Sequence, residues 1–207
     1  MTLGITGGIG SGKSYVSHLL TEHFGIPVYN CDAEAKRLNV ESEEIKQQLV
    51  ALVGPEVYGA DGSLQRKVLA DFLFASAENA ALVNAITHPV VARDFREWVS
   101  RHSLSDTGKA KETAIVAMEC AILFESGFDA LVDVVINVSA PTQLCIERAT
   151  VRDKSSAEAI RRRIALQMSD DERRLRAHYT IENDGRDLIP QVQQLLQDLH
   201  TKKIVKK

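Results

Sequence analysis

The chain has 207 residues, a length that suits one α/β domain with insertions. Its formal net charge of −3 excludes a general electrostatic attraction to nucleic acid or to an anionic membrane, so any basic function must be local. The three cysteines are widely spaced and form no C-x-x-C pair, which argues against a disulfide framework or a zinc site. The start of the chain resembles neither a signal peptide nor a membrane anchor, so we expect a cytoplasmic protein.

The first elements surround a glycine-rich loop. Residues 3–6 predict a short buried strand, and the apolar spacing over 13–24 predicts an amphipathic helix. Between them, Gly7–Ser14 reads G-G-I-G-S-G-K-S and matches G-x-x-x-x-G-K-[ST] completely. Glycines let backbone N–H groups converge on phosphate oxygens, and the helix adds the positive end of its dipole. Lys13 is expected to reach the β- and γ-phosphates of ATP, and the Ser14 hydroxyl to bind Mg²⁺. A chance glycine turn is the alternative, and the strand–loop–helix context disfavours it.

A second strand is predicted at 27–30, and Asp32 follows it. At the carboxyl edge of a sheet, this carboxylate could accept a proton from an acceptor hydroxyl or orient that hydroxyl. It could equally be the N-cap of a helix that starts near residue 33, and position alone leaves both interpretations open. The helical pattern up to residue 102 is too long for a simple crossover, so we interpret it as an inserted subdomain for a second substrate. Residues 103–112 are polar and read as a surface linker.

Apolar runs at 113–118 and 133–138 predict two strands covered on both faces. Glu119 ends the first run, where an acid of the Walker B type would lie, although an ordinary strand-end carboxylate fits equally well. Arg148 and Arg152 follow on one face of a helix, four residues apart. The planar guanidinium of arginine can donate two hydrogen bonds to a phosphate, so both residues could contact phosphate. The alternative is that they face solvent, as a run of charged residues usually does.

The remaining pattern continues the alternation of strands and helices. S-x-x-E capping boxes that begin at Ser155 and Ser169 predict two helix starts, and Arg174 between them and the last strand is expected to be mainly solvated. A last strand is predicted at 179–181 and a last helix around 188–199. Alternating strands and helices imply a mostly parallel sheet.

A phosphate loop alone does not separate a kinase from a nucleotide-binding switch or a motor. The switch needs D-x-x-G and N-K-x-D elements, and the sequence contains neither. A kinase needs an acceptor pocket, a group that handles the acceptor proton, and cations near the transferring phosphate, and candidates for all three exist.

Several short segments, taken in order, resemble the dephospho-CoA kinase family over essentially the whole chain. The matching segments are the glycine loop, Asp32-Ala33, Asp61–Arg66, Thr87-His88-Pro89, Ile122–Gly127, Gln143-Leu144 with Arg148 and Arg152-Asp153, Arg163-Ile164 with Gln167–Ser169, and Asn183–Gly185. Each segment is weak by itself, and their order and spacing are specific. The resemblance implies that ATP phosphorylates the ribose 3′-hydroxyl of dephospho-CoA, giving CoA and ADP. A nucleoside or nucleotide kinase of the same class is the nearest alternative, and a switch without an acceptor is the other.

The resemblance also implies the fold: α/β, of the P-loop nucleoside/nucleotide-kinase type, with three layers and a mostly parallel five-stranded sheet. One domain, 1–207, would consist of a core (1–31, 113–146 and 179–207), a helical CoA-binding insert (32–102) and a lid (about 147–178). No nucleic-acid partner, membrane or obligate protein partner is expected.

Site residues are assigned by the same resemblance. The catalytic group would be Asp32 as the base, with Lys13, Arg148 and Arg152; ATP would lie against Gly8, Ile9, Gly10, Ser11, Gly12, Lys13, Ser14, Tyr15, Asn183 and Gly185, with Mg²⁺ on Ser14. Dephospho-CoA would contact Asp32, Arg66, His88 and Glu125, although a lone histidine before proline is by itself more often structural.

Three positions depart from the family pattern. Asn30 stands where the family commonly has a first aspartate, so the acid role falls on Asp32. Ala121 replaces a proline, and Tyr15 replaces the threonine after Ser14. None of these changes removes a group assigned to catalysis.

Overall fold

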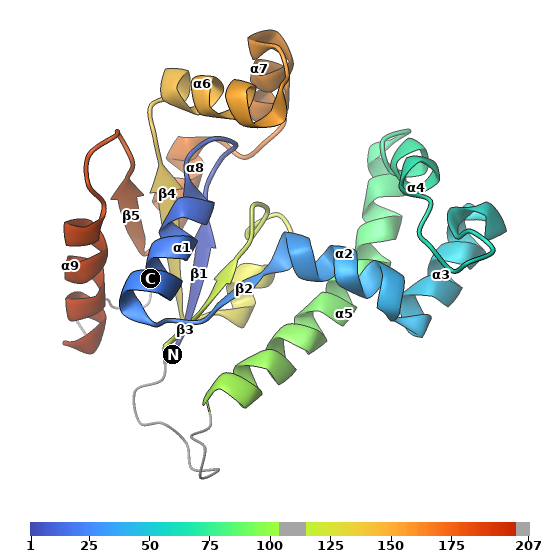
Figure 1. Cartoon of the computed structure of the whole chain (residues 1–207), viewed down its shortest axis with the longest axis horizontal. Helices are drawn as coiled ribbons and strands as arrows, with labels where there is room; N and C mark the ends of the chain where they lie inside the picture. The colour runs from blue at the N-terminus through green and yellow to red at the C-terminus, as the bar shows by residue number, and fades with distance from the viewer. Residues whose placement is uncertain (104–114, 202–207) are drawn as a thin grey trace. The chain divides into compact units, whose positions relative to one another are not determined.

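The computed structural model describes residues 1–103 and 115–201. The chain divides into two compact units, one made of Met1–Tyr29 and His102–Lys207 and the other of Asn30–Arg101 (Figure 1). Apart from residue 103, which ends helix α5 (Ala77–Ser103), the linker predicted at 103–112 lies outside the described residues. Residues 113 and 114 of the predicted third strand lie outside them as well.

A five-stranded sheet forms the centre of the first unit. Its strands are β1 (Thr2–Thr6), β2 (Val28–Asn30), β3 (Val116–Glu119), β4 (Val134–Ser139) and β5 (Tyr179–Glu182). Their order is β2-β3-β1-β4-β5, and β1 pairs in parallel with both β3 and β4, as β4 does with β5. The predicted mostly parallel five-stranded sheet is confirmed. Because β1 is central, the loop that follows it lies at the middle of the carboxyl edge, where ligands of such sheets bind.

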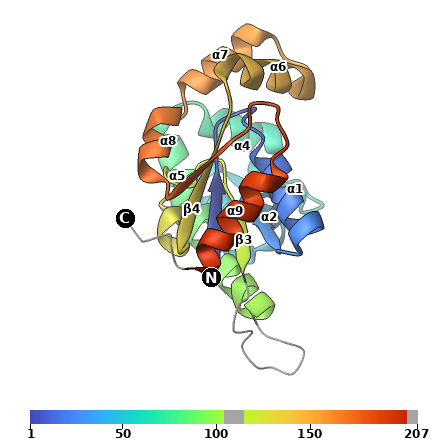
Figure 2. The ribbon, with the colours of Figure 1, turned by 90° about the vertical axis from the view of Figure 1, so that its left-hand side faces the viewer.

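Helices cover the sheet. The first unit contains α1 (Lys13–Phe24), α6 (Thr142–Asp153), α7 (Ala157–Ala165), α8 (Asp170–Arg176) and α9 (Ile189–His200), with a short helical turn η2 (Phe128–Leu131). Figure 2 shows α1 and α9 near one another, crossing the strands. The segment between β3 and β4 supplies the opposite layer, because a Cβ on Gly4 would lie 2.9 Å from the side chains of Leu123 and Val132.

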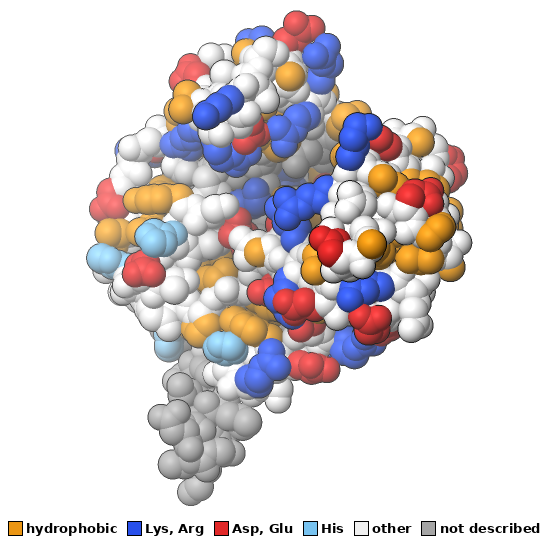
Figure 3. Space-filling view, turned by 45° about the vertical axis from the view of Figure 1, so that its right-hand side comes forward, with side chains coloured by type: hydrophobic (Ala, Val, Ile, Leu, Met, Phe, Trp, Pro, Cys, Tyr) orange, Lys and Arg blue, Asp and Glu red, His pale blue; other side chains and the backbone are white. Residues whose placement is uncertain are grey.

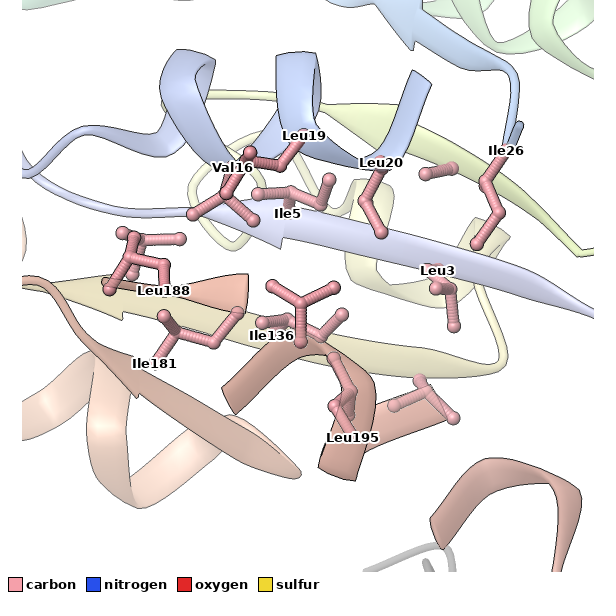
Figure 4. Packing of buried hydrophobic residues seen from close by; sticks show 14 of the residues in the cluster. Leu3, Ile5, Val16, Leu19, Leu20, Ile26, Ile136, Ile181, Leu188 and Leu195 are labelled. Carbon is pink, nitrogen blue, oxygen red and sulfur yellow. The ribbon is translucent and has the colours of Figure 1, made fainter. Parts of the chain in front are cut away.

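The main core lies between β1, β4, β5 and the two helices α1 and α9 (Figure 4). Leu3 and Ile5 of β1 meet Val16 and Leu20 of α1, and Leu195 of α9 packs against the same cluster. All five side chains are fully buried, and a buried Leu or Ile contributes roughly 1.5–3 kcal/mol. This packing fixes the direction in which α1 leaves the glycine loop.

Capping residues set the helix starts of α7 and α8. Ser169 caps α8, as predicted, by accepting a hydrogen bond from the N–H of Glu172. The box predicted to begin at Ser155 is wrong by one residue, because Ser156 is the N-cap of α7 and accepts from the N–H of Ala159. Ser155 instead donates to the carbonyl of Asp153 in the turn after α6, so it is not free to cap.

The second unit is helical. It contains α2 (Cys31–Glu41), α3 (Glu43–Val53), the short turn η1 (Pro55–Val57), α4 (Arg66–Leu73) and most of α5. Arg37 of α2 pairs with Glu34, Glu41 and Asp94, the last of these on α5. Within residues 1–103 and 115–201, no helix is both long enough and apolar enough to span a bilayer.

Candidate active site

The glycine loop, Gly7–Ser14, joins β1 to α1 and is called the phosphate loop below. Its backbone is turned tightly, with the N–H of Ser11 donating to the carbonyl of Gly8. Gly12, the N-cap of α1, has a φ of 92°, and a Cβ there would lie 2.1 Å from Nδ2 of Asn183. Only glycine fits both the angle and the contact. At Gly12 no side chain therefore covers the backbone of the loop, and turns with exposed backbone N–H groups of this kind bind phosphate.

Two side chains of the phosphate loop were predicted to contact the ligand: the Lys13 ammonium and the Ser14 hydroxyl. Lys13 is the first residue of α1, and no hydrogen bond or ion pair joins its ammonium to another residue that the structure describes. The Ser14 hydroxyl donates to Oε1 of Glu119 over 2.6 Å. Glu119 ends β3, in register with Ile5 of β1, and only 6% of it is exposed. The parallel pairing of β1 and β3 thus brings the acid beside the start of α1.

Ser14 and Glu119 form a pair of oxygen ligands that suits a hard cation. Mg²⁺ prefers one or two protein oxygens plus substrate phosphates and water, rather than a full protein cage. The described residues contain no cluster of three or more His, Cys, Asp or Glu that could enclose a metal. The pair supports the Walker B interpretation of Glu119 over that of an uninvolved strand-end carboxylate.

Asn183 connects the phosphate loop to two distant elements. It follows β5, is buried, and donates from Nδ2 to the carbonyl of Ser11 over 2.8 Å. Arg148 of α6 donates to both the carbonyl and the side-chain oxygen of Asn183, over 3.3 and 3.2 Å. Gly185, two residues later, has a φ of 103° and shapes the turn. Arg148, Asn183 and the loop are thereby brought together.

Arg152 lies elsewhere, although it is one turn from Arg148 on the same helix. It pairs with Asp153 at 2.7 Å, and Arg163 of α7 pairs with the other oxygen of that carboxylate. Hydrogen bonds from the two arginines lower the pKa of Asp153 to about 2. Figure 3 shows Lys and Arg side chains gathered at the top of the view, over α6 and α7. The Arg152 side chain is 57% exposed, and of the two arginines Arg148 is the one that contacts the surroundings of the loop.

In the second unit, Asp32 lies exposed in the first turn of α2. The N-cap of α2 is Asn30, whose Oδ1 accepts from the N–H of Ala33 over 2.9 Å. The interpretation of Asp32 as the N-cap is therefore wrong, because the helix begins two residues earlier than the sequence indicated. Asn30, the departure from the family pattern, has a structural role that asparagine fills as well as aspartate.

The other predicted substrate residues lie on separate elements. Arg66 begins α4 and borders a groove of about 250 Å³ whose remaining lining comes from α2, α4 and the chain before α4: Lys36, Asn39, Val40, Leu64, Leu69, Ala70, Leu73 and Phe74. Lys36 stands one turn after Asp32 on α2 and so on the same face. His88 lies half-buried on α5, and burial lowers its pKa. Glu125 lies in the first unit, exposed in the segment after β3.

Comparisons with a family model, with relatives and with solved structures identify the family of this chain. The family model for dephospho-CoA kinase matches residues 1–188. The chain belongs to the dephospho-CoA kinase family. A dephospho-CoA kinase from Bacteroides fragilis is 47% identical over 201 residues, which cover 97% of this chain and 93% of the relative. The crystal structure of TT1252 from Thermus thermophilus is 34% identical, with a TM-score of 0.79 over 96% of this chain and 97% of that one.

A dephospho-CoA kinase from Campylobacter jejuni has the same fold, with a TM-score of 0.67 over 98% of each chain at 22% identity. The predicted fold class and family are confirmed by these findings together with the sheet order. The roles of the individual site residues stay predictions, and the proposals below rest on the contacts that this member of the family makes.

Sequence reasoning missed a polar network on α8. Arg174 was expected to be mainly solvated, but it pairs with Asp170 at 2.6 Å and with Glu182 of β5, and it donates to the Ser139 hydroxyl over 2.5 Å. The i,i+4 spacing of Asp170 and Arg174 was the available signal. The contacts with Ser139 and Glu182 depend on strand ends that lie next to each other only in the folded sheet.

Two further residues of the same region touch the phosphate loop. Gln167, in the turn before α8, accepts at Oε1 a hydrogen bond from the N–H of Ile9 over 2.9 Å. Arg173, buried on α8, lies against Gly8. No local pattern distinguishes either residue from its neighbours, because both contacts join segments about 160 residues apart.

Proposed function

We propose that the chain transfers the γ-phosphoryl group of ATP to the 3′-hydroxyl of the ribose of dephospho-CoA, giving CoA and ADP. The observation that supports this best is the intact phosphate loop, in which Lys13 has no partner among the described residues and Ser14 lies against Glu119, in a chain of this family. ATP as donor and Mg²⁺ as its metal are part of the proposal. So is a cytoplasmic location, for which the supporting observation is that the three cysteines are buried and form no disulfide.

The phosphate loop holds the donor. Its backbone N–H groups and the start of α1 bind the phosphates, and the Lys13 ammonium neutralises the β- and γ-oxygens. Ser14 and Glu119 would hold Mg²⁺, which would supply positive charge to counter the negative charge that builds on the phosphates. The contact of Asn183 with the Ser11 carbonyl fixes the loop, and Arg148 fixes Asn183. The turn Asn183–Gly185 is proposed to border the adenine.

Asp32 acts on the acceptor. The 3′-oxygen attacks the γ-phosphorus, the bond to the β,γ-bridging oxygen breaks, and the hydroxyl proton passes to the Asp32 carboxylate. An exposed carboxylate in the first turn of a helix, not occupied in capping, is available for this role. Because the transition state is loose, orientation of the hydroxyl by Asp32 contributes alongside proton removal.

The helical unit is proposed to bind the rest of the acceptor. Its groove offers an apolar floor from α4 with two cations, Lys36 and Arg66, on its border. Phe74, 82% exposed, extends the apolar surface at the end of α4. Apolar surface beside positive charge complements a molecule that carries a long pantetheine arm on a diphosphate. Arg152 and the helices α6 and α7 are proposed to form the lid.

The decisive experiment compares acceptors. ADP release is measured with ATP-Mg²⁺ alone, with dephospho-CoA, and with a panel of nucleosides and nucleotides at the same concentration. We expect ADP release to depend on dephospho-CoA, and ³¹P NMR of the product to show a new ribose 3′-phosphomonoester. Turnover that is faster with a nucleoside or nucleotide than with dephospho-CoA would instead make the chain a different small-molecule kinase.

A further inference from the structure

Two adjacent arginines on α8 have opposite surroundings. Arg174 is fully engaged by the carboxylates of Asp170 and Glu182 and by the Ser139 hydroxyl. Arg173 is only 6% exposed, and its one hydrogen bond within the described part of the chain runs from Nη1 to the carbonyl of Met168. Its Nε is buried and has no hydrogen-bond partner among those residues. Arg173 is therefore a buried guanidinium without a carboxylate bonded to it.

Burial of such a guanidinium lowers the stability of the folded protein when no anion is bound. Arginine stays protonated, so its burial leaves a charge that destabilises the folded protein unless a counter-charge is nearby. Burial lowers the pKa of Arg173, and the nearby carboxylates of Asp170 and Glu125 only partly oppose this. Within the described structure Asp170 forms no hydrogen bond with Arg173, and its oxygens accept from Ser139, Asn137 and Arg174. The guanidinium is therefore available to an anion from outside the chain.

The position of Arg173 indicates which anion. A cavity of about 320 Å³ lies beside the phosphate loop, and Arg173 lines it together with Gly8, Ile9, Ser11, Thr142 and Gln167. A Cβ on Gly8 would lie only 2.8 Å from Nη2 of Arg173, so glycine at this position lets the guanidinium reach the loop. Gln167 holds the adjacent N–H of Ile9, which fixes this half of the loop against the turn that leads into α8.

We infer that Arg173 is a further phosphate-binding residue of the reaction, which contacts the γ-phosphoryl group of bound ATP. The second half of a phosphate loop and its lysine enclose the α- and β-phosphates and reach the γ-phosphate from one side. Arg173 meets the first half of the loop, at Gly8, and offers Nη2 to the terminal oxygens. A planar guanidinium that donates two hydrogen bonds suits those oxygens, and it is fixed before the ligand arrives.

This inference rests on the proposed function, and its test uses binding as well as turnover. Arg173→Met and Arg173→Lys are compared with the unaltered chain, and Arg174→Met is the matched control from the next position. Calorimetry measures the affinity of each for the β,γ-methylene analogue of ATP and for ADP, both with Mg²⁺. Circular dichroism and thermal melts report on folding.

For Arg173→Met we expect the ATP analogue to bind about 10- to 100-fold more weakly, as the loss of charge-assisted hydrogen bonds implies, while ADP affinity changes less than threefold. Arg173→Lys keeps the charge without the fork and should recover part of the difference. Arg174→Met should lower the melting temperature and leave the ratio of the two affinities unchanged. If Arg173→Met does not fold, the same ratio is read from Arg173→Lys, for which we expect a smaller loss of the same kind.

Equal losses for the analogue and ADP, or no loss for either, would overturn the role of Arg173. Either result would leave untouched the dependence of ADP release on dephospho-CoA in the unaltered chain, so failure of this inference is distinguishable from failure of the proposed function.

Discussion

The two units position their candidate site residues by different means. Around the phosphate loop, buried and partly buried hydrogen bonds hold the groups in place: Asn183 is bonded to Ser11 and Arg148, Ser14 to Glu119, and Gln167 to Ile9. In the helical unit the candidate residues are exposed or half-buried, on three separate helices, and the ion pair of Arg37 with Asp94, whose side chains are 40% and 18% exposed, joins two of them, α2 and α5.

The contrast has a physical consequence. Hydrogen bonds that are wholly or partly shielded from water fix geometry, whereas ion pairs near the surface contribute only about 0–1 kcal/mol each and are weakened by salt. The phosphate loop is thus preorganised for charge stabilisation, and the helical unit is suited to adapt to a long, flexible acceptor. Substitutions around the loop should therefore change the rate most, and substitutions in the helical unit should change acceptor affinity.

The largest effect is expected for Lys13→Ala. The ammonium is unpaired in the described structure, so its removal breaks no contact there and the melting temperature should barely move. Turnover should fall on the order of 10³-fold or more, because the charge that counters the β- and γ-phosphates is lost. Steady-state turnover and a thermal melt measure the two quantities, and near-normal turnover would refute the assignment of the phosphate loop.

The next largest effect is expected for Asp32→Asn, which keeps the shape of the side chain and removes the proton acceptor. Turnover with dephospho-CoA should drop at least about 100-fold, with ATP affinity unchanged. Asn30→Ala is the matched control on the same helix, because it removes the true cap of α2 and should cost about 1 kcal/mol of stability with little change in turnover. An active Asp32→Asn enzyme would exclude Asp32 as the base.

The phosphate loop could be predicted from the sequence, but the roles of the arginines around it could not. The loop Gly7–Ser14, its strand and its helix are local patterns, and α1 spans 13–24 as expected. The arginines between 148 and 176 look alike in sequence, but packing separates them: Arg148 meets Asn183, Arg173 is buried at Gly8, and Arg174 is paired with two carboxylates. Such sorting depends on contacts between distant segments, which periodicity and spacing do not encode.

A smaller effect, on the acceptor side, is expected for Arg66→Ala. If the groove of the helical unit binds the diphosphate of the acceptor, loss of this cation should raise KM for dephospho-CoA about 10-fold and leave KM for ATP unchanged. Lys67→Ala is the matched control, because Lys67 is the next residue of α4, is 89% exposed and pairs only with Asp71 within the described structure. Equal KM values for dephospho-CoA in the two variants would exclude this role for Arg66.

The smallest effect concerns pH and His88. Burial lowers the pKa of His88 below its ordinary value near 6.5, so the folded state binds fewer protons than the unfolded state as the pH falls through that value. The stability that the neutral ring provides is fully present above the unfolded pKa and is lost as the pH drops towards the folded one. His88→Asn removes this dependence, whatever its effect on packing at pH 7.5.

Urea unfolding at several pH values between 7.5 and 5.5 should therefore give a steeper decline in the free energy of unfolding for the unaltered chain than for the variant. The other histidines and the carboxylates titrate in both proteins and cancel in the difference. Parallel declines would mean that His88 is as readily protonated in the folded unit as in the unfolded chain, which would suit a solvated, ligand-facing ring better than a packed one.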